Sequence, residues 1–292
     1  MRIRKLLRVR FVVDPFTEQE KIMAELTPMM QKYMETKEQY KDCILFYRLG
    51  DFYEMFFDDA LVASKELEIT LTGKSCGLEE RAPMCGIPYH AVEGYLSKLV
   101  SRGYKVAICE QVEDPKLAKG LVKREVIRVV TPGTNLNVQS LEAGKNNYLL
   151  SIAYTPDGIG ISAADVTTGD YYVTEVEDLK KLNDELMKYE PSEIICNEAF
   201  LVSGFDVNDL KSRLHISVNA LESHMFDDDG CRRILMKHFK VNTLIGLGVE
   251  EFPTGLLAAG ALLQYLYDTQ KTDLEHFTHI YPYLTSKYML LK

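Results

Sequence analysis

The sequence lacks paired cysteines, long apolar runs and internal repeats. Its six cysteines are scattered along 292 residues, and no two of them form a C-x-x-C pair. This spacing argues against a zinc site or a disulfide framework and favours reduced thiols in the cytoplasm. No run of about 18 apolar residues occurs, so we expect no membrane span. With 46% hydrophobic and 26% charged residues, the chain has the composition of a soluble globular protein.

A surplus of basic residues is also absent. The chain has 34 Lys and Arg against 43 Asp and Glu, a formal net charge of −9 at pH 7. Proteins that bind nucleic acid usually present a basic face, because they neutralise phosphates. Most of the acidic surplus follows residue 134. The overall charge therefore argues against nucleic-acid binding, but a local patch in the first part of the chain can still bind.

Several stretches carry reactive side chains without the partners that their chemistry needs. Gly73-Lys74-Ser75 ends like a P-loop, but Glu68 stands where that pattern requires glycine. The run from Asp227 to Gly230 lacks the alternating ligands of a calcium loop and reads as a helix cap. His90 lies in a dense motif, but no Ser/His/Asp or Cys/His arrangement accompanies it. We therefore assign no catalytic residue and no metal ligand.

Residues 23–134 show the pattern of a mixed α/β domain. Apolar residues recur at helical or strand spacing between Gly, Pro and Asp breakers. We predict helices over 28–37, 52–67 and 88–99, with Asp51 as the N-cap of the second. We predict strands over 43–49, 68–72, 104–109 and 126–130.

Residues 135–253 are predicted to form a second α/β domain. A β-meander over 148–154, 159–166 and 171–176 precedes a helix over 179–189 and a strand over 193–196. This order resembles the opening of an RNase H-like fold. Asp165 and Asp170 lie on the meander, but a two-metal nuclease needs several converging carboxylates, and the first strand supplies none. A nuclease is the weakest of the alternatives.

The two ends of the chain differ from the middle. Residues 1–22 have a basic start and an apolar patch without a small-residue cleavage site, and we interpret them as a leader or vector-derived extension. Residues 254–292 open with a helix over 256–267 that is apolar on nearly all sides. A helix of this kind must bury every face, and its own segment offers no partner. We expect it to begin a truncated all-α domain.

The stretch GDFYEMFFDD, residues 50–59, places Phe52 two residues before Glu54. Core packing is the ordinary explanation of such rings. A second explanation is an apolar wedge, which minor-groove proteins insert between base steps to kink DNA. A glutamate beside the wedge is repelled by phosphates, so its role there must be discrimination rather than adhesion. A mispaired step unstacks more easily than a paired one, and the two side chains can sense this difference.

The surrounding residues resemble a known family. Segments 26–73, 82–100, 103–115, 123–134 and 164–173 are similar to the amino-terminal part of MutS, the bacterial DNA mismatch-recognition family. The resemblance implies a mismatch-recognition domain over 23–134, an RNase H-like connector over 135–253 and the start of a helical core or lever domain over 254–292. It also implies that Phe52 stacks on the mispaired base and that Glu54 hydrogen-bonds to it. Leu49, Lys74 and Met84 are candidate DNA-backbone contacts by position.

The resemblance further implies partners and a cofactor. The expected ligand is double-stranded DNA with mispairs or small loops, bound by a homodimer, and the connector is expected to meet a MutL-type partner. ATP and magnesium are expected in a carboxy-terminal domain outside these residues, so we expect no enzyme activity from this chain. The alternative from another class is a non-enzymatic protein-interaction module whose DNA contact is incidental.

Overall fold

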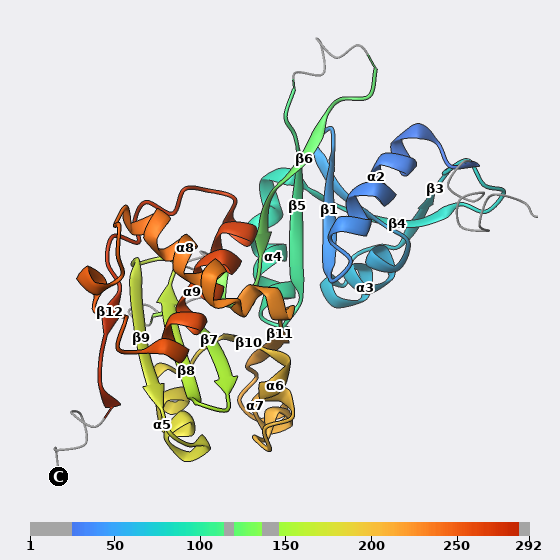
Figure 1. The fold of residues 1–292 in the computed structure, drawn as a ribbon. Helices are drawn as coiled ribbons and strands as arrows, with labels where there is room; N and C mark the ends of the chain where they lie inside the picture. The colour runs from blue at the N-terminus through green and yellow to red at the C-terminus, as the bar shows by residue number, and fades with distance from the viewer. Residues whose placement is uncertain (1–24, 114–119, 136–145, 286–292) are drawn as a thin grey trace, which may run out of the picture.

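The computed structural model describes residues 25–113, 120–135 and 146–285. Two mixed six-stranded sheets, each covered by helices, occupy separate halves of the molecule (Figure 1). The first sheet has the order β3-β4-β2-β1-β5-β6, and the second has the order β11-β10-β7-β8-β9-β12. The prediction of a mixed α/β fold is confirmed.

The first sheet is covered by helices on both faces. Its strands are β1 (Cys43–Leu49), β2 (Phe52–Phe56), β3 (Thr72–Lys74), β4 (Ala82–Pro88), β5 (Lys105–Gln111) and β6 (Arg124–Val130). Its helices are α2 (Pro28–Gln39), α3 (Phe57–Leu67), η1 (Tyr89–Ala91) and α4 (Val92–Val100). One apolar cluster joins α3 and α4 to the face that carries Tyr53 and Met55. A second cluster joins α2 to the opposite face, which carries Phe56.

The predicted helix over 52–67 is wrong in its first five residues. Gly50 and Asp51 form a two-residue hairpin loop between β1 and β2, so Asp51 is not a helix cap. Gly50 has φ +59°, which glycine adopts without a steric penalty. The helix begins only at Phe57. Pairing of β2 with two neighbouring strands overrides the helical pattern of its sequence.

The prediction also misplaced the strands that follow α3. The predicted strand over 68–72 is wrong, because Glu68 ends α3 in the left-handed conformation and β3 starts only at Thr72. Strand β4 was not predicted, since its prolines and Gly86 conceal it. The predicted helix over 88–99 is confirmed from Val92 onward, after the single turn η1. The predicted helix over 28–37 and the strands over 43–49, 104–109 and 126–130 are confirmed with small shifts of their ends.

The second sheet contains the predicted meander. Its strands are β7 (Tyr148–Thr155), β8 (Gly158–Asp165), β9 (Asp170–Val176), β10 (Glu193–Cys196), β11 (Ser217–Ala220) and β12 (Tyr281–Pro282). Strands β7, β8 and β9 pair antiparallel, and β10 joins β7 in parallel. The predicted helix over 179–189 and the predicted strand over 193–196 are confirmed within the bounds of α5 and β10.

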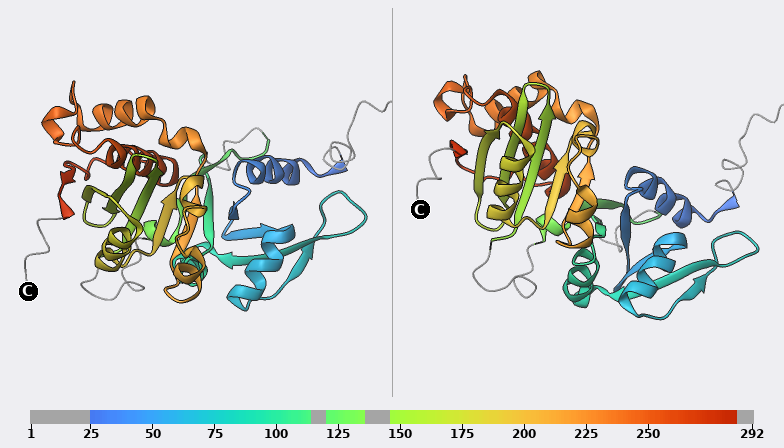
Figure 2. Two further views of the ribbon diagram at one scale, coloured as in Figure 1. Left: turned by 60° about the horizontal axis from the view of Figure 1, so that its bottom comes forward. Right: turned by 90° about the horizontal axis from the view of Figure 1, so that it is seen from below.

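Helices cover both faces of the second sheet (Figure 2). These helices are η2 (Pro132–Thr134), α5 (Leu179–Tyr189), α6 (Glu198–Leu201), α7 (Val207–Ser212), η3 (Ser223–Phe226), α8 (Asp228–Phe239), η4 (Ile245–Leu247) and α9 (Pro253–Gln270). One cluster joins α5, α6 and α7 to one face of the sheet. Another joins α8 and α9 to the opposite face.

Helix α9 corrects the expectation that the last apolar helix has no partner. It packs on β7, β8 and β9 and on α8. Leu256, Leu262 and Leu266 are fully buried in one cluster with Leu149 and Val173 of the sheet. The helix is apolar on nearly all sides because a sheet and a second helix surround it. It therefore completes the second core rather than opening a separate all-α unit.

The linker between the two sheets is anchored by the buried carboxylate of Glu193. This group accepts hydrogen bonds from Thr131 Oγ1 (2.5 Å), the Gly133 amide (3.0 Å), Asn219 Nδ2 (3.1 Å) and Tyr265 Oη (2.7 Å). A buried carboxylate is tolerated only when donors compensate for the lost water. Because the donors come from the linker, from β11 and from α9, one side chain ties the first domain to the second.

Close approach of α9 to β8 leads to the first prediction. A Cβ atom on Gly160 would lie 2.0 Å from the Thr254 carbonyl oxygen, so Gly160→Ala must displace the helix. We expect a loss of about 3 kcal/mol in the free energy of unfolding, at the upper end for overpacked sites. Gly94→Ala is the control, because nothing lies within 4 Å of its Cβ in α4, and it should stabilise by about 0.5–1 kcal/mol. Chemical denaturation measures both; equal effects would contradict the close contact.

The cysteines give a second prediction. All six are free and buried: Cys43, Cys76, Cys85, Cys109, Cys196 and Cys231. Burial raises the pKa of the Cys43, Cys85, Cys109, Cys196 and Cys231 thiols from 9.0 to about 12. Since the thiolate is the reactive form, a thiol reagent should label the native protein slowly and all six thiols after denaturation. Deprotonation opposes folding here, so stability should fall as the pH rises above 9.0. Rapid native labelling would contradict this burial.

Candidate nucleic-acid interface

Phe52 lies at the start of an interior strand and is still exposed. It follows the Gly50-Asp51 loop and pairs with Leu49 of β1 and with Pro88 of β4. Its side chain is 47% exposed, and it belongs to neither apolar cluster of the first domain. Backbone pairing on both sides holds the residue, while its ring stands free of the core.

Strand alternation sets the direction of the neighbouring side chains. Phe52, Glu54 and Phe56 lie on one face of β2, and Tyr53 and Met55 lie on the other. Phe56 is buried under α2, whereas Glu54 is half-buried and Phe52 is exposed. From Phe56 to Phe52, the side chains on this face of β2 therefore change from buried to exposed.

The five residues singled out in the sequence lie on this same face. Leu49 is opposite Phe52, and Met84 of β4 is opposite Phe56. Lys74 of β3 reaches across β4 to Glu54, with 2.5 Å between its Nζ and the carboxylate. We name this set of five the Phe52 face; its members are Leu49, Phe52, Glu54, Lys74 and Met84. Four different strands contribute to it, so the sheet and not a single segment assembles it.

Glu54 and Lys74 form a partly buried ion pair. Their side chains are 15% and 34% exposed, and Lys74 Nζ also lies 5.5 Å above the centre of the Phe56 ring. Gly86 is opposite Glu54 on β4, and a Cβ atom there would lie 3.6 Å from the Glu54 Cγ. Position 86 therefore adds no side chain to the space beside Glu54.

Arg124 is a cation of this surface that the sequence analysis missed. It pairs with Gln111 at the edge of the sheet, and its guanidinium lies 5.2 Å from the centre of the Tyr47 ring. Its Nε also donates to the Arg48 carbonyl, at 2.7 Å. The signal was present, because extending the predicted strand over 126–130 by two residues puts Arg124 in phase with Val126 on this face.

The other motifs have structural roles. Gly73 and Lys74 lie in strand β3 and not in a loop before a helix, which rules out a P-loop. Asp227 caps α8 by accepting from the Gly230 amide at 2.9 Å. His90 is exposed, and its ring meets the Tyr89 ring edge-on.

The nuclease alternative is not supported by the geometry of Asp165. This residue is fully buried, and its carboxylate accepts from the Asn147 amide (3.0 Å), the Thr167 amide (2.8 Å) and Thr167 Oγ1 (2.6 Å). Asp170 is opposite Asp165 in the register and accepts from Asn146 Nδ2 at 3.1 Å. Both carboxylates thus hold a turn together. Within residues 25–113, 120–135 and 146–285, no group of three or more His, Cys, Asp or Glu side chains is arranged to hold a metal.

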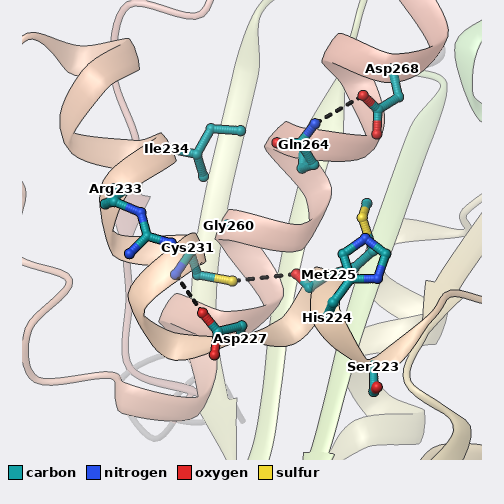
Figure 3. A pocket seen from close by; sticks show the side chains of 11 residues that line it. Ser223, His224, Met225, Asp227, Cys231, Arg233, Ile234, Gly260, Gln264 and Asp268 are labelled. Atoms are coloured by element: carbon teal, nitrogen blue, oxygen red, sulfur yellow. Dashed lines mark hydrogen bonds between the residues drawn. The ribbon is translucent and has the colours of Figure 1, made fainter.

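A large hollow lies elsewhere, beside α8 and α9 in the second domain (Figure 3). Its volume is about 640 Å³. Several of its polar side chains are engaged locally: Asp227 accepts from Gly230, Gln264 donates to Asp268, and Cys231 donates to the Met225 carbonyl. Figure 3 shows the Gln264–Asp268 pair apart from Cys231 and Met225. The hollow therefore does not have the character of a catalytic centre.

The fold and the site together define a class of protein. It is a two-sheet α/β protein whose distinctive residues form an exposed face rather than an enclosed centre. None of the helices in the described part of the chain is both long and apolar enough to cross a membrane. The family model MutS domain I matches residues 27–139, and the model MutS domain II matches residues 147–278. Since the two matches together cover most of the chain, it belongs to the MutS family.

Individual relatives agree with this assignment. The DNA mismatch repair protein MutS of Lachnoclostridium phytofermentans is 67% identical over 92% of this chain, which corresponds to 29% of that protein. The MutS proteins of Ruminiclostridium cellulolyticum and Clostridioides difficile are 51% and 48% identical, each over 92% of this chain and over 31% and 28% of their own lengths. The chain thus spans less than a third of these relatives. The domain II match includes α9, in agreement with its packing on the second sheet.

The Glu54–Lys74 pair yields a third prediction, on stability alone. Because the pair is partly buried, a double-mutant cycle with Glu54→Gln and Lys74→Met should give a coupling of about 0.5–1 kcal/mol in the free energy of unfolding. The control is the Glu68–Lys98 pair, 3.5 Å apart with side chains 77% and 37% exposed, where coupling should be near zero. A coupling for Glu54 and Lys74 no larger than the control would show that they do not interact in solution.

Proposed function

We propose that this chain is the part of a DNA mismatch repair protein that senses the mispair. The single observation that carries the proposal is Phe52, an exposed ring on a strand paired on both sides, with Glu54 on the same face. The names of the relatives, all DNA mismatch repair proteins, support the same reading.

In the proposed mechanism the Phe52 ring enters the minor groove and stacks on a mispaired base. Opening a base step costs a few kcal/mol, and the cost is smaller where pairing is already faulty. Discrimination then needs no reading of sequence. The ring must project from the sheet before contact, and its 47% exposure meets that condition.

Glu54 is proposed to hydrogen-bond to the displaced base. In the free protein its carboxylate is held by Lys74. Approaching phosphates attract the lysine ammonium, and this frees carboxylate oxygens for the base. Leu49, opposite Phe52, and Met84, opposite Phe56, are both half-buried and are proposed to contact the sugar-phosphate backbone through their apolar surfaces.

Firm binding of the duplex is proposed to come from the rest of a full-length protein. Affinity for DNA needs many phosphate contacts, and this chain has a net charge of −9. We propose that the full-length protein is a homodimer that couples recognition to ATP and magnesium in another domain, and that a MutL-type partner contacts the second domain. No catalytic role is proposed for the residues of this chain, and its DNA ligand implies a cytoplasmic location.

The fourth prediction tests the wedge. In a full-length MutS protein that carries residues 25–285 of this chain, Phe52→Ala should lower the ratio of affinities for mispaired and paired duplexes. A lost base–aromatic stack of about 1–3 kcal/mol corresponds to a decrease in this ratio of about fivefold to 150-fold. Fluorescence polarisation with both duplexes measures the ratio.

Leu61→Ala is the matched control. Leu61 is 46% exposed, nearly as much as Phe52, but lies on α3. Its substitution should leave the ratio unchanged. If Phe52→Ala also leaves the ratio unchanged, the wedge role is wrong.

The alternative is a protein-interaction module with incidental DNA contact. Leu201 and Val202, 43% and 84% exposed at the end of α6, give this alternative a specific surface. This alternative requires that Val202→Ser abolish partner binding by the full-length protein. It also requires that Phe52→Ala leave mismatch discrimination unchanged. The wedge proposal requires the opposite result for Phe52→Ala.

A further inference from the structure

The reverse side of the β1–β2 hairpin carries a partly buried polar cluster. Arg48 and Tyr53 are opposite one another in the register, on the face away from Phe52. Both donate to Glu110 of β5: Arg48 Nη1 lies 3.2 Å from Oε1, and the Tyr53 hydroxyl bonds to the same oxygen. Burial, together with the hydrogen bond to Glu110, raises the pKa of Tyr53 well above its ordinary value, so its hydroxyl remains a donor.

The same cluster holds the backbone of the hairpin loop. Arg48 Nε donates to the Gly50 carbonyl at 2.5 Å, and the Tyr89 amide donates to the Asp51 carbonyl at 3.0 Å. The Arg48 guanidinium stacks on the Tyr89 ring, 3.8 Å from its centre. Both carbonyls of the two-residue loop are therefore occupied, one from a side chain and one from the neighbouring strand end.

The setting of the cluster makes its contacts stronger than those of surface pairs. The side chains of Arg48 and Glu110 are only 16% and 23% exposed. Electrostatic attraction increases as water is excluded, and the stacked guanidinium adds a cation–π contact. By contrast, the loop that these groups hold contains Gly50, and glycine has more backbone conformational freedom than any other residue type.

We propose that Arg48, Tyr53 and Glu110 are positioning residues that hold the hairpin rigid, so that the Phe52 ring keeps one direction. The proposal rests on the proposed wedge function of Phe52. If the loop were loose, it would become ordered when the ring enters the duplex. The entropic cost would be about 1–2 kcal/mol of binding free energy for each backbone residue that becomes ordered. A hairpin that is rigid before contact avoids this entropic cost. Whether the ring enters then depends on how easily the base pair unstacks.

The fifth prediction uses the lack of tryptophan in this chain. Phe52→Trp introduces one indole as a reporter, and Glu110→Gln removes the negative charge that Arg48 faces while keeping the size of the side chain. Without DNA, Glu110→Gln should raise the amplitude of the sub-nanosecond anisotropy decay of that indole about twofold. A change of this size is typical of a backbone segment that goes from rigid to flexible. Tyr53→Phe, which removes only the hydroxyl, should give a smaller increase in the same direction.

The chain offers a matched control in Glu66. Like Glu110, it accepts from an arginine and a tyrosine, Arg102 and Tyr104, but it lies on α3 away from the hairpin. Glu66→Gln in the Phe52→Trp background should leave the anisotropy decay unchanged. A general loss of stability would affect both glutamate variants, whereas a positioning role affects only Glu110→Gln.

Binding measurements separate failure of this inference from failure of the proposed function. In the full-length protein, Glu110→Gln should lower the mispaired-to-paired affinity ratio severalfold and leave affinity for the paired duplex unchanged. An indole as rigid in Glu110→Gln and Tyr53→Phe as in the parent would overturn the positioning role, whatever Phe52→Ala does. An unchanged ratio in Phe52→Ala would instead overturn the wedge function, even if the indole is loosened.

Discussion

The pairing of β2 between β1 and β4 is the constraint on which the rest of the first domain depends. It places Phe52 at the end of a strand whose backbone is held on both sides, and it gives each face of the hairpin a separate task. An exposed aromatic ring on a mobile loop would collapse onto nearby apolar surface. On a strand paired on both sides, the backbone is fixed and cannot move to bury the ring, so the ring remains exposed.

The two faces of the hairpin are chemically different. The face with Phe52, Glu54 and Lys74 carries the exposed ring beside a partly buried ion pair. The reverse face is tied to β5 through Glu110, whose ion pair with Arg48 is also partly buried. After strand β6, the Glu193 carboxylate of the second domain accepts two hydrogen bonds from the linker residues Thr131 and Gly133 and two from Asn219 and Tyr265.

The errors of sequence interpretation have identifiable physical causes. The first five residues of the helix predicted over 52–67 form a strand, because the apolar spacing of Phe52 to Phe56 suits either period and Gly50-Asp51 can be either a hairpin loop or a helix cap. Helix α9 was taken as unpartnered, because its sequence shows that it must be buried but not against what. In both cases local pattern was ambiguous and long-range packing decided the outcome.

The sequence by itself determined the class of fold, the meander of the second domain, the existence of five α-helices and the family, since all of these follow from residue spacing and from ordered blocks of residues. It also singled out Phe52 and Glu54. Only the tertiary structure decided that Lys74 meets Glu54, that Arg48 and Tyr53 share Glu110, and that Phe52 is exposed. These contacts join strands that are twenty or more residues apart in the chain. Which strands become neighbours is set by the packing of the whole sheet, because one local sequence can pair in several registers and only one of them buries every apolar face.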